Sequence, residues 1–355
     1  PPLHLYRKYG LDFVDHLRGM YAIALYDPIE GQLVLARDPF GIKPLYYAQT
    51  DHGFAFASEP QALIDSGMVA PRVNPTALAE LLQLQFTTGA ETVFDGITRV
   101  LPGESVVVRD GRVVARRRRS VLPSEGAADW SEETALELLD TALRNSVEVH
   151  QRSDVPYGMF LSGGVDSSAL LALMSELNSQ PVQAFTAGFV GTSVPDEREH
   201  ARELARITGA EMTDLAIDAD MFWRELPKIA AAMDDPAADY AMVPTYFLAE
   251  AVKAAGLKVV LTGEGGDELF AGYGRYRSAM RPWWRGGRGM RARGVFDGLG
   301  VLRDPPTGWR DGIAAAEQTA DTGTYSRLQS AQAADCADWL PNDLLIKVDR
   351  CLMSH

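Results

Sequence analysis

The sequence predicts a mixed α/β protein, in which an antiparallel sheet with a little helix is followed by a doubly wound parallel sheet. In the first 120 residues, short segments alternate apolar and polar residues and are separated by turns, which is typical of antiparallel strands. From Ser131 onward, short apolar strands alternate with helices, which favours a parallel sheet covered on both faces. The 355 residues suit two domains, and we expect them at 1–120 and 131–355, joined by a linker at 121–130.

Composition limits the classes of partner. The net charge of −14 argues against a nucleic-acid partner bound by general electrostatics. No apolar stretch approaches the length of a membrane span, so we expect no membrane partner. The two cysteines, Cys336 and Cys351, indicate neither a disulfide framework nor a zinc site, and they fit a reducing, cytoplasmic environment.

In the first part, the pattern predicts two hairpins, a helix and two further strands. The helix is expected at 75–85, with Asn74 as its N-cap and Pro75 at its first position. The expected strands are Met20–Tyr26, Gln32–Arg37, Pro44–Tyr47, Gly53–Ser58, Val93–Val100 and Glu104–Arg109.

In the second part, a helix is expected to begin at Ser131. Four apolar residues recur there at helical spacing: Leu136, Leu139, Leu143 and Val147. A strand is expected at Val182–Phe189, with its C-terminal end beside the loop that follows the preceding strand. The next helix is expected to carry Asp196 and Glu197 in its first turn, where the helix dipole favours negative charge.

The strongest functional signal is a glycine- and serine-rich turn between a short apolar strand and a helix. In this geometry, backbone N–H groups and a helix N-terminus converge on an anion. The turn is not the lysine-containing phosphate loop, because no lysine follows its glycines. The alternative is an ordinary Gly/Ser turn at a helix start. We expect an anion site formed by Phe160, Leu161, Ser162, Gly163, Gly164, Val165, Asp166, Ser167 and Ser168.

A second acidic and glycine-rich segment follows the apolar strand Lys258–Thr262. A capped helix start would account for one of its acids, Glu264 or Asp267, but leaves the others unexplained. Ligands of doubly wound sheets bind at strand C-termini, near the point where the strand order reverses. We therefore expect Asp166 and Asp267 to face each other across one crevice and to bind Mg²⁺, together with water and phosphate oxygens.

These segments also resemble known families. The run Ser162–Ser168 resembles the pyrophosphate-binding loop of the ATP-pyrophosphatase (PP-loop) enzymes. Residues 18–22, 35–47 and 56–59 resemble the later part of a class II glutamine amidotransferase domain, which is an N-terminal-nucleophile (Ntn) sandwich. With Thr262–Tyr273 and Lys347–Arg350, the whole chain resembles the glutamine-hydrolysing asparagine synthetase family.

The resemblance implies an ATP-dependent amide ligase that converts aspartate and glutamine-derived ammonia to asparagine, AMP and pyrophosphate through β-aspartyl-AMP. It implies ATP and Mg²⁺ as cofactors and catalytic roles for Glu264 and Asp267, with Glu264 acting around formation and capture of the acyl-adenylate. It places the serines, glycines and Asp166 of the first loop at the pyrophosphate end of ATP. Four further nucleotide-contacting residues are implied: Phe160, Ala187, Thr262 and Gly263.

The chain departs from the family at its ends. The N-terminal catalytic cysteine and the glutamine-binding segment of the family are absent, and the sequence looks cut at both ends. We expect the intact protein to hydrolyse glutamine and this chain not to do so. Three alternatives stay open: a relative that amidates another carboxylate, a β-lactam-synthetase-like enzyme, and a non-catalytic nucleotide-binding homologue. A homodimer is also open.

Overall fold

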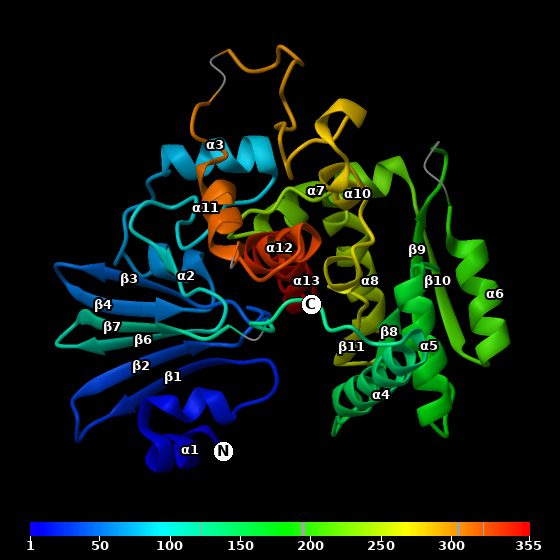
Figure 1. The fold of residues 1–355 in the computed structure, drawn as a ribbon, viewed down its shortest axis with the longest axis horizontal. Coiled ribbons are helices and arrows are strands. Elements are labelled where there is room, and N and C mark those ends of the chain that lie inside the picture. Colours follow the sequence, from blue (N-terminus) through cyan, green and yellow to red (C-terminus); the bar gives the residue numbers. More distant parts are fainter. Residues whose placement is uncertain (121, 193–195, 304–305, 322) are drawn as a thin grey trace. The chain divides into compact units, whose positions relative to one another are not determined.

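The computed structural model describes all residues except 121, 193–195, 304–305 and 322, and the chain forms two compact units (Figure 1). The first unit contains residues 1–126, 233–239 and 267–349. The second contains residues 127–232, 240–266 and 350–355. Val121, the first residue of the expected linker, lies outside the described residues. The contacts therefore group much of the C-terminal sequence with the N-terminal part, whereas the sequence suggested two consecutive domains.

Two antiparallel sheets, ordered β1-β2-β6-β7 and β4-β3-β5, form the N-terminal part of the first unit. The strands are β1 (Ala22–Asp27), β2 (Gln32–Arg37), β3 (Tyr46–Thr50), β4 (Gly53–Ala57), β5 (Thr98–Arg99), β6 (Glu104–Arg109) and β7 (Arg112–Arg118). The helices of this part are α1 (Pro2–Tyr9), the 3₁₀ helix η1 (Gly10–His16), α2 (Pro60–Asp65) and α3 (Pro75–Leu84). Both expected hairpins are confirmed, because β1 pairs with β2 and β3 with β4 in antiparallel register.

Alternating side chains give these sheets two faces. Leu35 of β2 packs with Tyr47 of β3 in a core between the sheets. Its neighbour Val34 packs against α1 and η1 on the opposite face of the first sheet. On the outer face of the second sheet, α2 contributes Leu63 to a further core. The order helix, sheet, sheet, helix confirms the expected sandwich.

Two local predictions differ in outcome. The helix at 75–85 is confirmed, because the Asn74 side chain accepts hydrogen bonds from the N–H groups of Thr76 and Ala77. The expected strand Val93–Val100 is wrong in length, because only Thr98–Arg99 pairs as a strand. A turn interrupts it: Gly96 has φ +83°, and the Ile97 N–H bonds back to the Phe94 carbonyl.

Helices form the C-terminal part of the first unit. They are α10 (Gly274–Met280), the 3₁₀ helix η2 (Trp283–Arg285), α11 (Asp311–Ala320), α12 (Arg327–Ala334) and the π-helical segment η3 (Asp335–Leu345). Two further helices, α9 (Gly266–Phe270) and α13 (Ile346–Met353), each begin in one unit and end in the other. Tyr276, Met290 and Ala331 are buried together in one core of this part.

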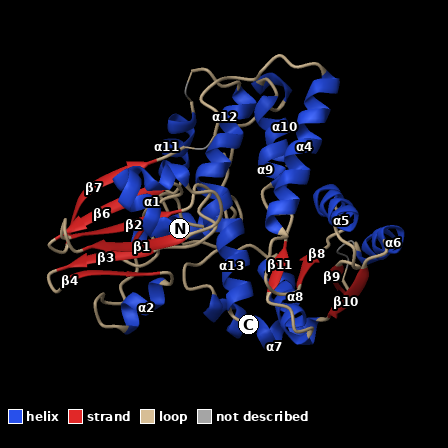
Figure 2. Cartoon of the chain, turned by 90° about the horizontal axis from the view of Figure 1, so that it is seen from below, coloured by secondary structure: helices blue, strands red, loops and turns tan. Residues whose placement is uncertain are grey.

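A parallel sheet of order β10-β9-β8-β11 forms the second unit. Its strands are β8 (Tyr157–Phe160), β9 (Gln183–Phe189), β10 (Glu211–Ile217) and β11 (Val259–Leu261). Its helices are α4 (Glu132–His150), α5 (Val165–Leu177), α6 (Arg198–Thr208), α7 (Ala219–Ala232) and α8 (Met242–Ala254). Helices α5 and α6 lie on one side of the sheet and α7 and α8 on the other (Figure 2). The expected doubly wound sheet is confirmed; β10 was not predicted.

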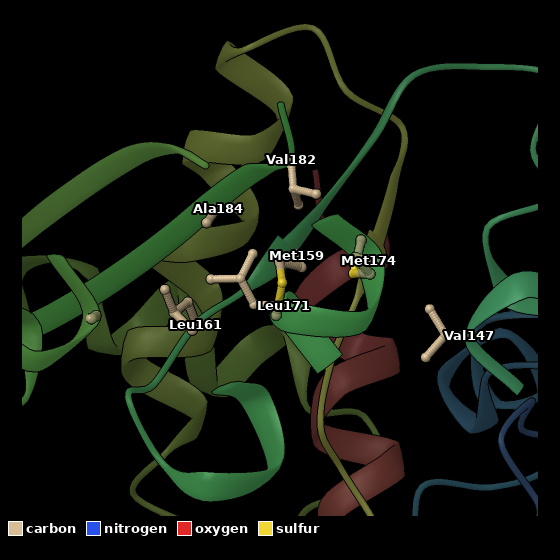
Figure 3. Packing of buried hydrophobic residues seen from close by; sticks show 8 residues of the cluster. Val147, Met159, Leu161, Leu171, Met174, Val182 and Ala184 are labelled. Atoms are coloured by element: carbon tan, nitrogen blue, oxygen red, sulfur yellow. The ribbon is translucent and has the colours of Figure 1, made fainter. Parts of the chain in front are cut away.

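Each face of this sheet has its own core. On one face, Met159 of β8 and Leu171 of α5 are fully buried (Figure 3). On the other face, Phe185 of β9 packs with Leu248 of α8. The helix expected from Ser131 is present as α4, but only its end joins the core: Val147 is buried, whereas Leu136 is 58% exposed. Among the described residues, no helix has the length and apolar character needed to cross a membrane.

Candidate active site

The loop after β8 has the geometry that its sequence predicts. The Leu161 N–H donates to the Phe185 carbonyl at 2.8 Å, which continues the pairing with β9 past the end of β8. Gly163 then has φ +81°, a conformation that favours glycine. The Ser162 hydroxyl oxygen accepts a hydrogen bond from the Gly164 N–H at 3.2 Å. The turn is therefore compact and rich in N–H and hydroxyl groups.

Helix α5 begins directly at this loop, with Gly164 as its N-cap. The hydroxyls of Ser167 and Ser168 donate to the Gly164 carbonyl at 3.2 and 2.6 Å. The first N–H groups of a helix have no carbonyl partner within it, and together they carry partial positive charge. Val165 in this first turn is 86% exposed, so the helix start is open to an anion. Binding of pyrophosphate here remains a prediction.

The first turn of α6 supports the same loop, which the sequence did not reveal. A methyl group at Gly163 would lie 3.3 Å from the Glu197 carbonyl oxygen and 3.6 Å from the His200 Cβ. The backbone of the loop therefore packs closely on this helix end. A side chain at Gly163 would suffer both positive φ and crowding.

The loop after β11 contacts the loop after β8. Strand β11 pairs in parallel with β8, which places the two C-terminal strand ends next to each other. A methyl group at Gly263 would lie 3.5 Å from the Ser167 amide nitrogen, and one at Gly266 would lie 2.5 Å from Asp166 Oδ2. Glu264 lies exposed in the turn between these glycines. The sheet order reverses at β8, so these loops flank the switch point, where ligands bind in such folds.

The end of β9 carries a charged cluster that differs from the prediction. Helix α6 begins at Arg198, so Asp196 precedes the helix rather than occupying its first turn. Asp196 accepts bidentate hydrogen bonds from Arg198, and these lower the pKa of Asp196 to about 2. A methyl group at Gly188 would lie 2.5 Å from Arg198 Nε, so only glycine leaves room for this guanidinium. The spacing of two residues between Asp196 and Arg198 could have predicted this ion pair from the sequence.

The residues expected around adenosine lie beside the second core. Phe160 and Ala187 are partly buried against the cluster that contains Phe185 and Leu248. Thr262 and Gly263 follow β11 and are half-buried. The structure therefore brings Phe160, Ala187 and Gly263 to the ends of three adjacent strands, and their contact with a nucleotide remains a prediction.

Asp267 belongs to the first unit, and its approach to Asp166 remains a prediction. Its own segment is tight: the Gly272 N–H donates to the Asp267 carbonyl at 3.0 Å, and Gly272 has no room for a side chain beside the Asp267 carboxylate. The next residue, Glu268, is fully buried, and burial raises the pKa of its carboxyl group. Gln332 of α12 donates to the Glu268 carbonyl at 3.0 Å.

Two family matches cover most of the sequence. Residues 138–355 match the asparagine synthase family, and residues 2–118 match the glutamine amidotransferase domain. The chain belongs to the asparagine synthase family. The resemblances to the glutamine amidotransferase domain and to the asparagine synthetase family are thereby confirmed.

Relatives with curated names span more than this chain. Asparagine synthetase [glutamine-hydrolyzing] 1 of Bacillus subtilis is 31% identical over 99% of this chain and 61% of its own length. A putative asparagine synthetase [glutamine-hydrolyzing] of Mycobacterium tuberculosis is 31% identical over 99% of this chain and 60% of its own length. Amidase chyE of Penicillium rubens is 32% identical over 78% of this chain and 43% of its own length. The chain therefore spans about 60% of the first two relatives.

The Lys347–Arg350 segment of this asparagine synthase family member forms ion pairs within the first unit. Lys347 is buried and lies 2.8 Å from Asp239, and Asp349 lies 2.9 Å from Lys43. These pairs join α13 to the segment 233–239 and to the N-terminal part. The segment therefore has a clear structural role.

No complete metal site of protein side chains is present in the described part of the chain. Within it, no group of three or more His, Cys, Asp or Glu side chains could hold a metal ion. A cavity of about 380 Å³ in the first unit is lined by residues such as Glu80, Thr88 and Asp338, and none of its lining residues is a predicted site residue. A bound Mg²⁺ would accordingly need oxygens from a phosphate ligand and water.

Proposed function

We propose that this protein is an ATP-dependent amide ligase of the asparagine synthase type. The observation that carries the proposal is the contact between the two loops after β8 and β11, where Gly266 leaves room for the Asp166 carboxylate. One loop supplies N–H and hydroxyl groups suited to pyrophosphate, and the other carries Glu264 just after the neighbouring strand β11. The reaction joins aspartate and ammonia to give asparagine, AMP and pyrophosphate through β-aspartyl-AMP.

The loops after β8 and β11 would supply groups for each step of the reaction. The side-chain carboxylate of aspartate attacks the α-phosphorus of ATP, and pyrophosphate leaves toward the N–H groups at the start of α5 and the hydroxyls of Ser162 and Ser168. Ammonia then displaces AMP from the acyl group, and the exposed Glu264 accepts the surplus proton. Two hard carboxylates, Asp166 and Asp267, would hold Mg²⁺, which would neutralise phosphate charge when bound.

Family membership and the named relatives support the amide-ligase chemistry. The amidotransferase match at residues 2–118 supports glutamine as the ammonia source of the intact enzyme. The only cysteines of this chain, Cys336 and Cys351, are both buried, so we propose that the chain itself uses free ammonia. Aspartate is proposed as the acceptor because the first relatives are named asparagine synthetases.

The test measures pyrophosphate release with ATP, Mg²⁺ and ammonia, with and without aspartate, together with asparagine formation. We expect aspartate-dependent release in the unmodified protein. Asp166→Asn and Glu264→Gln should each lower the rate on the order of 100-fold or more, because each removes a group proposed to act on the reacting atoms. Asp154→Asn, at an exposed loop position of the second unit, is the matched control and should leave the rate unchanged. Release that does not depend on aspartate would contradict the proposed acceptor.

A further inference from the structure

Residues 269–296 concentrate positive charge in an acidic chain. This stretch contains seven arginines and no lysine, aspartate or glutamate, so 27 basic and 48 acidic residues remain elsewhere. Five of the arginines are exposed: Arg277, Arg281, Arg285, Arg288 and Arg293. The other two, Arg275 and Arg291, pair with the buried Asp335. Within the described residues, the five exposed guanidinium groups form no ion pair, so their charge is available to a partner.

Two adjacent tryptophans stand among these arginines. Trp283 is 82% exposed and Trp284 is 69% exposed. Their rings meet edge to face with centroids 6.1 Å apart, so the two indoles form one projecting aromatic group. A tryptophan side chain has about 150–250 Å² of surface to bury, and exposure of two side by side is typical of a contact surface.

The turn that displays the indoles is built by specific contacts. We call residues 281–288 the Trp–Arg turn. Within it, the Pro282 carbonyl accepts hydrogen bonds from the N–H groups of Arg285 and Gly287 at 2.9 and 3.1 Å. The Arg288 N–H donates to the Ser278 carbonyl of α10 at 3.3 Å, and Gly287 has no room for a side chain beside the Arg281 carbonyl. The fold therefore holds both indoles outward.

Anchors at each end fix the Trp–Arg turn to the first unit. Before it, Tyr276 and Ala279 of α10 are buried in a core, and after it Met290 is buried in the same core. The Tyr276 hydroxyl also donates to Asp335 at 2.7 Å. The exposed indoles thus lie on a turn that is fixed at both ends.

We infer that the Trp–Arg turn is a contact surface for an anionic lipid bilayer. Indole rings prefer the headgroup level of a membrane, and basic side chains near a bilayer surface are attracted by anionic headgroups. A stable protein–protein interface buries about 800 Å² of surface per partner, contributed by about 20–30 residues, which is more than an eight-residue turn provides. A small projecting turn can nevertheless insert its aromatic side chains among the headgroups of a bilayer. The negative charge of the rest of the chain is screened beyond about 8 Å at physiological salt.

This inference concerns a surface contact and is independent of the proposed ligase chemistry. The expectation of no membrane partner rested on the lack of a spanning segment, and a tip that lies in the headgroups requires none. The Trp–Arg turn contains none of the residues proposed to bind ATP or magnesium. Variants in it should therefore leave aspartate-dependent pyrophosphate release unchanged in solution.

The test is co-sedimentation of the protein with vesicles of phosphatidylcholine alone or with 30 mol% phosphatidylglycerol, at physiological salt, where the net negative charge of the chain is screened. We expect binding only to the anionic vesicles, with a blue shift of tryptophan emission. Trp283→Ala/Trp284→Ala should abolish the shift, whereas Trp223→Ala, which removes an indole that is 68% exposed in the second unit, should not. Equal binding to both vesicle types, or no binding, would overturn the inference.

Two further variants separate a bilayer from a protein partner. Replacing Arg281, Arg285 and Arg288 by glutamine should weaken binding to anionic vesicles by about 100-fold. Each basic side chain near an anionic surface strengthens binding by a similar factor, so the three losses multiply. Replacing them by lysine should retain most of the binding, since a bilayer attracts point charges. Concentration-dependent self-association that the glutamine variant loses, without vesicle binding, would assign the turn to a second copy of the chain and overturn the inference.

Discussion

Gly266→Ala tests the contact that carries the functional proposal. Its methyl group would lie 2.5 Å from Oδ2 and 2.6 Å from Cγ of Asp166, whereas carbon contacts are comfortable at about 3.5 Å or more. The Asp166 carboxylate must therefore move by about 1 Å. A displacement of that size in a reacting group costs on the order of 100-fold in rate. Because the shifted atoms are the end of a half-buried side chain, the free energy of unfolding should fall by about 1 kcal/mol, at the low end of the cost of overpacking.

Two other glycines provide matched controls. A methyl group at Gly263 would meet ordinary contacts at 3.5 and 3.6 Å, and one at Gly274 would meet nothing within 4 Å. None of the three glycines has positive φ, so alanine suits the backbone at each. Of the three alanine variants, only Gly266→Ala should show a clear loss of stability in urea unfolding. Gly274→Ala should release pyrophosphate at the rate of the unmodified protein.

A double variant distinguishes crowding from a general defect. Asp166→Ala removes the carboxylate that the new methyl group would strike, so Gly266→Ala/Asp166→Ala should regain stability without regaining activity. The reasoning is refuted if Gly266→Ala matches Gly274→Ala in both stability and rate. It is also refuted if the double variant is no more stable than Gly266→Ala.

Two further predictions concern buried charge in the first unit. Asp235→Ala removes the carboxylate that lies 2.7 Å from the buried Arg99 guanidinium, so the free energy of unfolding in urea should fall by about 3–5 kcal/mol. As a control, Asp140→Ala removes a carboxylate from the exposed pair with Arg144 and should lower that free energy by under about 1 kcal/mol. Burial raises the pKa of Glu268, so the stability linked to its protonation is present below the unfolded pKa of about 4.3 and lost as pH rises through the folded pKa. Glu268→Gln should therefore match the unmodified protein near pH 4 and exceed it by about 1–3 kcal/mol at pH 8; an equal difference at both pH values would contradict this.

Local chemistry explains why much of the second unit could be predicted. The conformation of the loop at 162–168 is determined by its own residues: Gly163 adopts a positive φ, and the hydroxyls of Ser162 and Ser167 form a hydrogen bond within the turn. Parallel pairing then follows from the alternation of strands and helices. Because β8 and β11 both end in glycine-rich segments, their meeting at the switch point was also expected.

Other features depend on contacts that a sequence pattern does not contain. The grouping of 267–349 with the N-terminal part rests on pairs such as Lys43–Asp349, which join residues 306 positions apart. The turn at Asp95–Gly96 was a readable signal that was outweighed by flanking apolar residues. The exposure of Leu136 shows that helical periodicity identifies a helix without showing that its whole apolar face is covered.

The acidic, glycine-rich segment that follows β11, residues 263–273, runs from the second unit into the first. Helix α9 begins with Gly266 in one unit and continues with Asp267 in the other. On the second-unit side, Gly266 is constrained by the Asp166 carboxylate. On the first-unit side, Gln332 holds the carbonyls of Glu268 and Leu269 at 3.0 and 2.7 Å. Gln332 of α12 therefore holds the first-unit end of this segment, although the sequence of the segment contains no sign of it.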